Sequence, residues 1–573
     1  MRDGANYIDV LVVGAGPVGL ITAFQLAKFG GISVRIVEKH VKSTQDAYGR
    51  AITLFPRTIE MLDQLGLADE LLQSCFACRD TVTYNSDGQE VEGRGWSFMK
   101  HMGDTTFNFA LVLRQKFQEE IFRNAMEKYG VRVETPVELT TASVVPSDLD
   151  MDYRITAVLL HHNDGVYETV RCKHLIGCDG GHSSVRSIFN IPFEGSASED
   201  RWVRIDGQVK TNVPKPRSYC SIESPTHGNV LWAPLDRGAT RIGFAFTDNR
   251  AEKYAKFDET AAVEEAIAAV KPFDVEFESV DWWTIYTVGQ RIAKNFSVKD
   301  CIFLAGDACH THSSGAAQGM NTGIHDAVNL AWKLYLTLRG VTVLDLLQTY
   351  QAERLPNVQR LIQYDKDISR LMTNRLPENW EGDPDTDVNV ILGRLFKEAG
   401  VFTSGLGISY EMQKDDHLNV QGSFHGSQPQ VKPGKRGPDV TLLRPGTFEP
   451  TRLIRELSNL ACFYILIFAA ERLPPIPKEI HDCELEDGRY RKFITILPRR
   501  GSSPYELLGG KPPLGHAYFD TEDQHAYRQY GISPKQGAVV ILRPDGWIGT
   551  MVVLGKESIE EVEEYFRPFD FDE

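Results

Sequence analysis

The feature that most constrains the fold is a glycine-rich turn that joins an apolar strand to a helix near the start of the chain. Residues 8–13, IDVLVV, form a short, β-branched run that predicts a strand buried on both faces. Gly14-Ala15-Gly16-Pro17-Val18-Gly19 follows, and residues 20–31 show helical apolar spacing closed by glycine. Residues 33–39, SVRIVEK, predict a second strand. The first forty residues therefore predict a β-α-β unit.

The turn has the spacing of a dinucleotide site. Gly14 permits the tight turn, Gly16 lets backbone N–H groups approach a pyrophosphate, and Gly19 lets the helix pack on the strand. Pro17 is compatible because the first helical turn has spare N–H groups. Glu38 ends the second strand about 20 residues on, where a carboxylate can bind ribose hydroxyls. A tight structural turn is the alternative interpretation. Only one such fingerprint is present, so a second dinucleotide would bind transiently or not at all.

The rest of the chain predicts two further kinds of structure. Alternating apolar and polar stretches over about 80–110 and 200–285, such as VLWAPLD and RIGFAF, indicate antiparallel sheet. A helix at about 114–129, strands at 173–180 and 301–307, and a helix at 322–339 continue the α/β part. A linker is expected over 405–440, and strands at 463–469 and 537–554 with a helix at 556–566 indicate a separate α+β domain.

Composition narrows the class of protein. The 573 residues suggest about three domains. The net charge of −16, with no basic stripe, argues against nucleic acid as a partner, and no apolar run is long enough for a membrane span. The nine cysteines are odd in number and scattered, and no signal peptide precedes the first strand, so we expect reduced thiols and a cytoplasmic location. Cys75 and Cys78 lack a second pair, so we expect core thiols and no metal.

The stretch 303–323, FLAGDACHTHSSGAAQGMNTG, is unusual for a protein core. A strand ends in Gly306-Asp307 and is followed by small and polar residues with scarcely a bulky aliphatic one. A helix N-cap would explain Gly306 and Asp307 but not twenty such residues. The composition indicates a segment that lines a ligand.

Three motifs in order carry a resemblance to a known family. GAGPVGL, CDGGHSSVR (178–186) and AGDACHTHSSGAAQGMNTGIHDAVNLAWKL (305–334) resemble the class A flavoprotein monooxygenases, most closely the phenol hydroxylase (phenol 2-monooxygenase) group, over residues 7 to about 365. GKRGPDV (434–440), AYRQYGI (526–532) and AVVILRPDGWIG (538–549) resemble the thioredoxin-like C-terminal domain of that group, which serves oligomer contacts. Only Cys462 and Cys483 lie in that domain, far apart, so dithiol exchange is not expected.

The resemblance implies the fold class and its boundaries. We expect an α/β FAD-binding domain of the p-hydroxybenzoate hydroxylase type, an inserted antiparallel β-sheet domain that binds substrate, and a thioredoxin-like α+β domain. The FAD-binding parts are 1–84, 111–200 and 286–365, the sheet domain 85–110 and 201–285, a helical and linker region 366–432, and the last domain 433–573.

The resemblance also implies the residues that hold FAD. Gly306 and Asp307 would contact the ribityl chain, and the helix that begins near Asn321 would present N–H groups to the flavin ring. Asp179-Gly180 with Arg186 would contact flavin and NAD(P)H, although a turn closed by an N-cap at Ser183 or Ser184 is the alternative. The role of Arg291 stays open. The full set of predicted cofactor residues is Gly14, Gly16, Pro17, Gly19, Glu38, Lys39, Arg50, Gln115, Asp179, Gly180, Gly306, Asp307, Gly319, Met320 and Asn321.

The substrate side departs from the phenol hydroxylase pattern. Ile52 stands where that group has an aspartate, Gly243 where it has a tyrosine, and Ser314 where a proline is usual, whereas Arg241 matches its arginine. These changes leave the catalytic base and simple phenol as substrate open, and a larger polycyclic or polyketide-like phenol would suit the extra room. The candidate catalytic residues are Arg241, Tyr219, Tyr286 and Ser314, with Asp46, Tyr48 and His312 as further residues that could reach the site.

The expected activity is that of an FAD-dependent monooxygenase of secondary metabolism. NADPH or NADH would reduce the flavin, O2 would form a C4a-hydroperoxide, and a small phenolic or aromatic substrate would be hydroxylated. A homodimer or higher homo-oligomer is expected. Baeyer-Villiger oxidation or epoxidation on the same fold, a flavin oxidase or dehydrogenase without NAD(P)H, and a non-catalytic flavin-binding protein are the alternatives.

Overall fold

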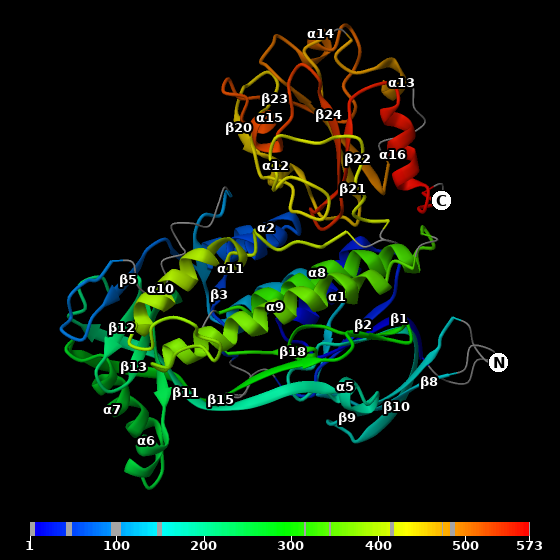
Figure 1. The fold of residues 1–573 in the computed structure, drawn as a ribbon. Coiled ribbons are helices and arrows are strands. Elements are labelled where there is room, and N and C mark those ends of the chain that lie inside the picture. The colour runs from blue at the N-terminus through cyan, green and yellow to red at the C-terminus, as the bar shows by residue number, and fades with distance from the viewer. Residues whose placement is uncertain are drawn as a thin grey trace.

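The computed structural model (Figure 1) describes residues 6–41, 49–92, 105–145, 152–313, 317–342, 345–412, 417–472, 474–481 and 488–571. Three large sheets and the helices between them organise this part of the chain. Among the described residues, no helix combines the length and the apolar character that crossing a membrane requires.

The first sheet is built on the predicted β-α-β unit. Its strands run in the order β16-β17-β10-β1-β2-β7, with β9 on β10 and β8 on β9, and β17, β10, β1 and β2 are parallel neighbours. The bounds are β1 (Asn6–Val13), β2 (Val34–Val37), β7 (Val133–Glu134), β8 (Val137–Val144), β9 (Ile155–His161), β10 (Val166–Gly177), β16 (Ser297–Val298) and β17 (Ile302–Leu304). The strand predicted at 301–307 is shorter because a 3-10 turn, η4 (Gly306–Ala308), begins where Gly306 takes a positive φ of 63°.

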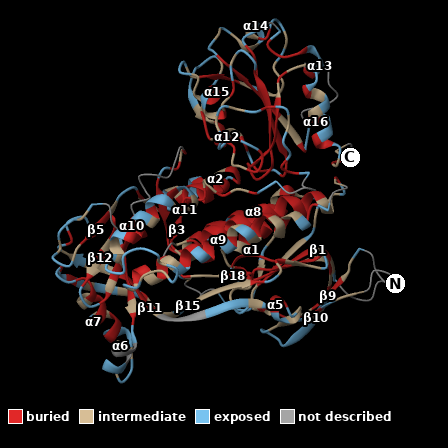
Figure 2. Ribbon diagram, in the orientation of Figure 1, coloured by how far each residue is buried: buried red, intermediate tan, exposed pale blue. Residues whose placement is uncertain are grey.

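Helices cover this sheet. α1 (Pro17–Phe29) packs against α4 (Gln115–Glu127) and α8 (Gly319–Leu338), and α9 (Gln348–Met372) lies along α8 (Figure 1). The other helices here are α2 (Pro56–Gln64), α3 (Ala68–Ser74) and α5 (Ser184–Ile188). α8 begins three residues before the predicted 322–339, because its first turn has a single apolar side chain, Met320, and a helix is recognised in sequence from several apolar residues at helical spacing. Figure 2 shows α8 buried along most of its length.

The second sheet has the order β18-β15-β11-β14-β13-β12-β5, and all its pairings are antiparallel except β5 with β12. Its strands are β5 (Thr81–Tyr84), β11 (Phe193–Thr211), β12 (Tyr219–Ser224), β13 (Gly228–Pro234), β14 (Thr240–Phe246), β15 (Val275–Ala293) and β18 (His310–Thr311), with η3 (Asp236–Gly238), α6 (Asp248–Lys253) and α7 (Glu259–Ala269) between them. The antiparallel sheet predicted over 200–285 is confirmed.

The predicted sheet segment 85–110 is more divided than expected. Residues 93–104 lie outside the described residues. Phe107 and Phe109 pack in the core of the first sheet, and β6 (Ala110–Val112) pairs with β3 (Thr53–Leu54) and β4 (Phe76–Cys78) in a small separate sheet. β5, just before this segment, joins the second sheet through β12, and Glu90 folds back to form an isolated bridge with Tyr84 of β5.

The third sheet forms the C-terminal domain, which lies above α8 and α9 in Figure 1. Its order is β20-β19-β23-β22-β21-β24-β25; β21, β22 and β23 are parallel, and β24 and β25 form the predicted hairpin. Its elements are β19 (Thr441–Leu443), β20 (Pro450–Arg452), α12 (Leu453–Glu456), β21 (Phe463–Phe468), α13 (Lys478–His481), β22 (Arg491–Leu497), α14 (Pro504–Leu507), β23 (His516–Asp520), α15 (His525–Tyr530), β24 (Ala538–Leu542), β25 (Ile548–Val553) and α16 (Ser558–Phe566). This is a thioredoxin-like arrangement.

The segment that precedes this domain is not a free linker. α10 (Val388–Glu398) and α11 (Gly400–Thr403) lead into it. Leu418 and Val440 are fully buried, and a Cβ atom on Gly422 would lie 2.4 Å from the Met551 carbonyl oxygen. The glycine and proline composition that predicted a linker over 405–440 therefore serves close backbone packing.

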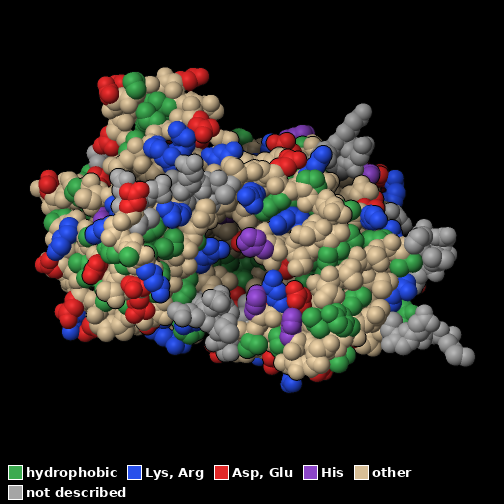
Figure 3. All heavy atoms as spheres, turned by 90° about the horizontal axis from the view of Figure 1, so that it is seen from below, with side chains coloured by type: hydrophobic (Ala, Val, Ile, Leu, Met, Phe, Trp, Pro, Cys, Tyr) green, Lys and Arg blue, Asp and Glu red, His purple; other side chains and the backbone are tan. Residues whose placement is uncertain are grey.

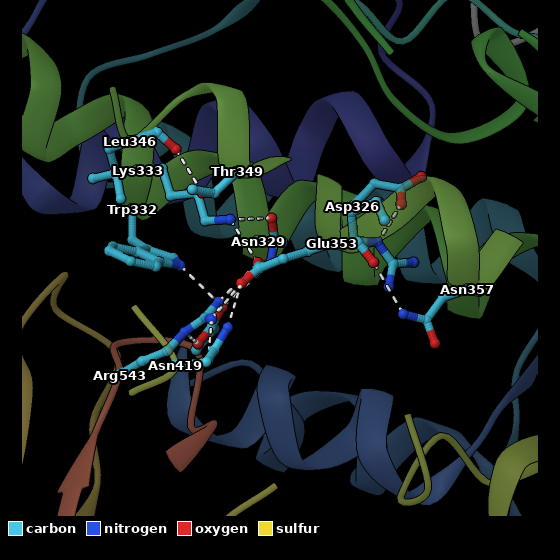
Figure 4. Close-up of polar contacts among 12 residues, drawn as sticks. Asp326, Asn329, Trp332, Lys333, Leu346, Thr349, Glu353, Asn357, Asn419 and Arg543 are labelled. Carbon is cyan, nitrogen blue, oxygen red and sulfur yellow. Dashed lines mark hydrogen bonds and ion pairs between the residues drawn. The ribbon is translucent and has the colours of Figure 1, made fainter. Parts of the chain in front are cut away.

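A buried cluster of charges joins the C-terminal domain to α8 and α9 (Figure 4). Glu353 on α9 accepts from Arg543 at the end of β24 and from Lys333 on α8, whose Nζ lies 2.6 Å away. Asp545 pairs with Arg543 at 2.7 Å and accepts from the Trp332 indole at 3.1 Å. Burial lowers the pKa of Lys333 to about 8, although the negative charge of Glu353 acts in the opposite direction. These charges are matched within the protein, so they fix how the two parts meet.

Candidate active site

In the glycine turn after β1, two glycines pack against neighbouring backbone and one faces open space. Gly14 has a φ of 100°, and a Cβ atom there would lie 2.4 Å from the Cys178 carbonyl oxygen, so only glycine fits. A Cβ atom on Gly19 would lie 1.9 Å from the Gly14 carbonyl oxygen. By contrast, a Cβ atom on Gly16 meets no described atom within 4 Å. The backbone at the start of α1 is therefore accessible on the side of Gly16, next to the positive end of the helix dipole.

Glu38, at the end of β2, lies against this turn. Its carboxylate accepts hydrogen bonds from the backbone N–H groups of Ala15 and His40, both at 2.9 Å. Lys39 beside it is exposed. Glu38 therefore ties the turn to the second strand and places a half-buried carboxylate at its edge.

Asp179 and Gly180 follow β10. One Asp179 oxygen accepts from the backbone N–H groups of Ser184 and Val185 at 2.6 and 3.1 Å, whereas its Oδ1 is buried and has no hydrogen-bond partner among the described residues. Burial raises the pKa of this carboxyl. Ser183 caps α5 through the Arg186 N–H group at 3.0 Å, so the predicted N-cap is present. The cap does not account for the burial of Asp179 Oδ1, to which no described residue donates a hydrogen bond.

Arg186 connects this loop to the one that follows β17. Its guanidinium donates to the Gly181 carbonyl at 2.7 Å and to the Ala308 carbonyl at 2.8 Å, and it lies 3.8 Å from the Phe193 ring centre. Arg291, for which no role was predicted, lies on β15 opposite Thr311 of β18.

Asp326 of α8 forms a hydrogen bond with the backbone of the Gly306-Asp307 turn. One Asp326 oxygen accepts from the Gly306 N–H group at 3.1 Å and lies 2.7 Å from His310 Nε2, and the other accepts from Arg354 of α9 at 2.7 Å. Burial opposes ionisation of Asp326, but Arg354 and His310 outweigh it and lower its pKa to about 2. Asp307 itself is exposed between the buried Gly306 and Ala308. Its carboxylate is thus available at the end of β17.

The same network includes the one group of described residues that has the spacing of a metal site. Cys309, His310 and Asp326 offer donor atoms within 4.8 Å of one another, all buried. The oxygens of Asp326 already accept from Arg354 and the Gly306 N–H group, and burial raises the pKa of the Cys309 thiol well above its usual value. An internal hydrogen-bond network accounts for this cluster without a metal.

The start of α8 faces the same region. No acidic residue lies in the first turn, and Gln318 donates to the Thr403 carbonyl instead of capping the helix. Gly319 is open, since a Cβ atom there would meet only the His312 ring at 3.8 Å, and Met320 is buried. The Asn321 amide donates to the Thr53 carbonyl and accepts from the Phe55 N–H group at 2.8 Å. Asn321 therefore orders the segment after β3 with its side chain.

Arg50 and Gln115 lie at the border between the first and second sheets. Gln115 accepts from the Ala51 N–H group at 3.1 Å and fills the space beside Gly49, where a Cβ atom would lie 2.4 Å from its side chain. The exposed Arg50 guanidinium lies 5.2 Å from the Tyr286 ring centre. The face seen from below is hollowed near its middle, and basic and histidine side chains gather at the edge of the hollow (Figure 3).

Three of the predicted catalytic residues, Tyr219, Arg241 and Tyr286, lie on the inner face of the second sheet. The Tyr219 hydroxyl oxygen lies 3.2 Å from Thr53 Oγ1, and burial raises the pKa of Tyr219 to about 12. Arg241 is bound by both oxygens of Asp206 at 2.6 and 2.9 Å and also donates to the Arg50 carbonyl. The charge of Arg241, predicted to face a substrate hydroxyl, is therefore matched by the sheet itself. Ser314, Asp46 and Tyr48 lie outside the described residues.

Three polar residues of this region, Arg204, Asp206 and Asp326, were not predicted from the sequence. Arg204 and Asp206 lie on the same inner face as Trp202, and the period-two alternation of WVRIDG (202–207) was a signal that could have indicated this. No sequence pattern indicates the role of Asp326, because its partners Gly306, His310 and Arg354 come from three separate elements.

Two protein-family models match this chain. The model of the FAD binding domain family matches residues 7–365, and that of the phenol hydroxylase C-terminal dimerisation domain matches residues 510–573. A phenol 2-monooxygenase of Aspergillus fumigatus is 28% identical, and the alignment covers 100% of this chain and 97% of that protein. A 3-hydroxybenzoate 4-monooxygenase of Comamonas testosteroni is 27% identical, with 98% of this chain and 95% of that protein covered.

Solved structures share the fold. Aklavinone-11 hydroxylase, in complex with FAD and aklavinone, superposes with a TM-score of 0.74 at 21% identity, covering 99% of both chains. The anhydrotetracycline hydroxylase of Streptomyces rimosus gives a TM-score of 0.71 at 23% identity, covering 98% of this chain and 99% of that one.

The fold and the family matches define an FAD-dependent oxidoreductase. The chain belongs to the FAD-dependent aromatic monooxygenases, in the group that resembles phenol hydroxylase. Its cofactor is FAD and it uses O2.

Proposed function

We propose that this chain hydroxylates a phenolic ring, with NAD(P)H as the reductant, in a site between the first and second sheets. FAD, when bound, would supply the hydride acceptor for NAD(P)H and the activation of O2, so that one oxygen atom enters the ring and the other leaves as water. One observation carries the proposal: four parallel neighbours, β17, β10, β1 and β2, end in Gly306-Asp307, Asp179-Gly180, the glycine turn and Glu38. In such sheets, ligands bind outside the carboxyl ends of the strands.

The residues at this edge fit a dinucleotide. The open backbone at Gly16 suits a pyrophosphate, with Pro17 starting the helix behind it, and Glu38 suits ribose hydroxyls. Asp307 is exposed, Asp179 Oδ1 is a buried acceptor to which described residues donate nothing, and Gly180 has an open side. The start of α8 from Gly319 to Asn321 offers N–H groups to the flavin ring. Arg50 and Gln115 lie at the border between the first and second sheets, and the exposed Lys39 follows Glu38 at the end of β2. We therefore assign FAD contacts to these residues.

The chain's own residues would orient the ring and exclude water. The core that joins the two sheets contains Ile52, Phe55, Trp202 and Tyr219, so a ring on this face is enclosed by apolar side chains. Tyr219 carries a proton at neutral pH because its pKa is raised to about 12, so it can donate a hydrogen bond but is a poor base there.

The decisive experiment is a screen of candidate phenols. Stimulated NAD(P)H oxidation is measured together with the mass and the regiochemistry of each product. Ring hydroxylation coupled to NAD(P)H consumption is expected. Insertion next to a carbonyl or across a double bond would favour Baeyer-Villiger oxidation or epoxidation. Reduction of the flavin by substrate without NAD(P)H would contradict the proposal and favour an oxidase or dehydrogenase.

We also propose that the protein is a homo-oligomer assembled through its C-terminal domain. The match of residues 510–573 to a dimerisation domain supports this. Light scattering of the purified full chain should give at least twice the monomer mass of 64.4 kDa.

A further inference from the structure

His312, just after β18, has a buried ring nitrogen that the contacts described above do not use. Its side chain is 2% exposed, and its Nδ1 lies 2.8 Å from the Ser313 carbonyl oxygen. Because a carbonyl oxygen only accepts, Nδ1 is the donor, and in the neutral imidazole Nε2 is then an acceptor. Nε2 is buried and has no hydrogen-bond partner in the part of the chain that the structure describes. The ring therefore keeps one nitrogen for a further interaction.

A buried carboxylate lies behind the imidazole. Asp365 of α9 is fully buried, and its Oδ1 lies 3.9 Å from His312 Nδ1. It accepts from the Ser313 N–H and hydroxyl groups at 2.7 and 2.5 Å and from the Gln290 amide at 2.8 Å, and these donors are all neutral. An opposite charge at about 4–6 Å favours the charged form of an ionisable group. Asp365 therefore favours a proton on His312.

The opposite edge of the imidazole faces the start of α8. A Cβ atom on Gly319, the first residue of that helix, would lie 3.8 Å from His312 Nε2. The first turn of α8 is the part of the chain assigned above to the flavin ring, which gains negative charge when it is reduced. His312 therefore lies between a fixed buried carboxylate and a position that becomes negative during the reaction.

A second histidine stacks on the imidazole but is already paired. The ring centres of His310 and His312 lie 6.4 Å apart, and His310 Nε2 lies 2.7 Å from Asp326 of α8. Asp326 is bound by Arg354 of α9 as well. Of the two rings, His312 is the one with an unused nitrogen beside Gly319.

We propose that His312 takes up a proton when the bound flavin is reduced, so that its imidazolium lies between two negative charges, the reduced ring and Asp365. Two electrons and one proton enter the flavin, and a second proton passes from water to His312 Nε2. Reoxidation by O2 releases that proton again. The inference rests on the proposed function for the place of the flavin ring, and it adds a proton-accepting residue to the reaction.

The test counts the protons that accompany the two electrons. The holoenzyme is reduced by xanthine and xanthine oxidase with a reference dye, and the potential of the bound flavin is measured from about pH 6 to about pH 9. Each proton contributes about 30 mV per pH unit to a two-electron couple, since this is a tenfold change in the equilibrium constant. We expect two protons, about 60 mV per pH unit, over part of this range. One proton throughout overturns the inference.

Two variants locate the second proton. His312→Gln and His312→Asn place an amide there, which takes up no proton, so the slope should fall to about 30 mV per pH unit. The control is His162→Gln, which removes a histidine whose side chain is 41% exposed beyond β9 and should keep the wild-type slope. A wild-type slope in the His312 variants overturns the inference, because the second proton then enters the flavin or another group.

Asp365→Asn keeps the imidazole and removes the charge behind it. Protonation of His312 is then less favourable, so the range of two-proton uptake should move to lower pH by about one unit or more. This variant decides the matter even if the His312 variants do not bind FAD. A range that stays in place overturns the inference.

The proton count is independent of the proposed hydroxylation, since it needs neither a phenol nor NAD(P)H. Two protons in the wild type and one in the His312 variants, without stimulated NAD(P)H oxidation by any phenol, would sink the hydroxylase and keep the role of His312. Hydroxylation by an enzyme whose flavin takes up one proton throughout would do the reverse.

Discussion

Asp307 is an exposed carboxylate at the carboxyl end of β17, beside the candidate flavin site. It projects from a turn whose neighbours, Gly306 and Ala308, are buried. Asp307→Ala should weaken FAD binding by about 10-fold or more, because a charge-assisted hydrogen bond to a ribityl hydroxyl is lost. The measurement is the ratio of flavin to protein after purification and the Kd on reconstitution. Glu120→Ala, at an exposed acid on α4, is the control. A fully flavinated, tightly binding Asp307→Ala protein would remove this assignment.

Two glycines of one turn should respond differently to the same change. Gly14→Ala introduces a side chain at a φ of 100° and 2.4 Å from a carbonyl oxygen, so the free energy of unfolding should fall by about 2 kcal/mol or more. Gly16→Ala meets no described atom within 4 Å, so the apoprotein should keep its Tm while FAD binds more weakly. Thermal melts of both apoproteins and FAD titrations check this. Equal loss of Tm in the two variants would show that the open side at Gly16 is not a ligand surface.

At the scale of elements, Asp326 ties α8 to α9 and to the Gly306 turn. Its pKa falls from 3.8 to about 2 on folding, so the ionised carboxylate stabilises the fold fully above about pH 4, and the stabilisation is lost as the pH falls toward 2. Asp326→Asn leaves Arg354 buried without its charge partner, which should cost about 3–5 kcal/mol at neutral pH. Urea unfolding of both proteins between pH 7 and 3 should show the difference shrinking toward the acid end. A difference independent of pH would contradict this role.

The elements that could be predicted from the sequence are those that local patterns specify. The strand at 8–13, the helix after it and the hairpin over 537–554 follow from apolar spacing and turn residues. The pairing of Asp206 with Arg241 could not be predicted, because it depends on the register of β11 against β14, which lie far apart in sequence. The close packing of Gly422 on Met551 could not be predicted either. The composition of 405–440 predicted a linker, because composition cannot distinguish a flexible glycine from one that packs under a neighbouring backbone.

At the scale of the whole molecule, the buried cluster of Glu353, Lys333, Arg543 and Asp545 joins the C-terminal domain to the helices that carry the candidate flavin site (Figure 4). Arg543→Met should lower the free energy of unfolding by about 3–5 kcal/mol, because Glu353 and Asp545 then share one buried cation. We expect calorimetry of the wild type to show the two parts unfolding together, and the variant to separate them into two transitions.

The matched control is Arg528→Met, which removes an exposed arginine of the same domain from its pair with Asp523 at 2.8 Å. Surface pairs of this kind contribute about 1 kcal/mol or less, so its melting profile should follow the wild type. If Arg543→Met still unfolds in one transition with an unchanged Tm, the apolar contacts between the parts hold them together without the charges. If it separates them and the flavin is released in the first transition, the C-terminal domain supports the flavin site through α8 and α9, since Arg543 binds Glu353 of α9 and Asp545 accepts from the Trp332 indole of α8.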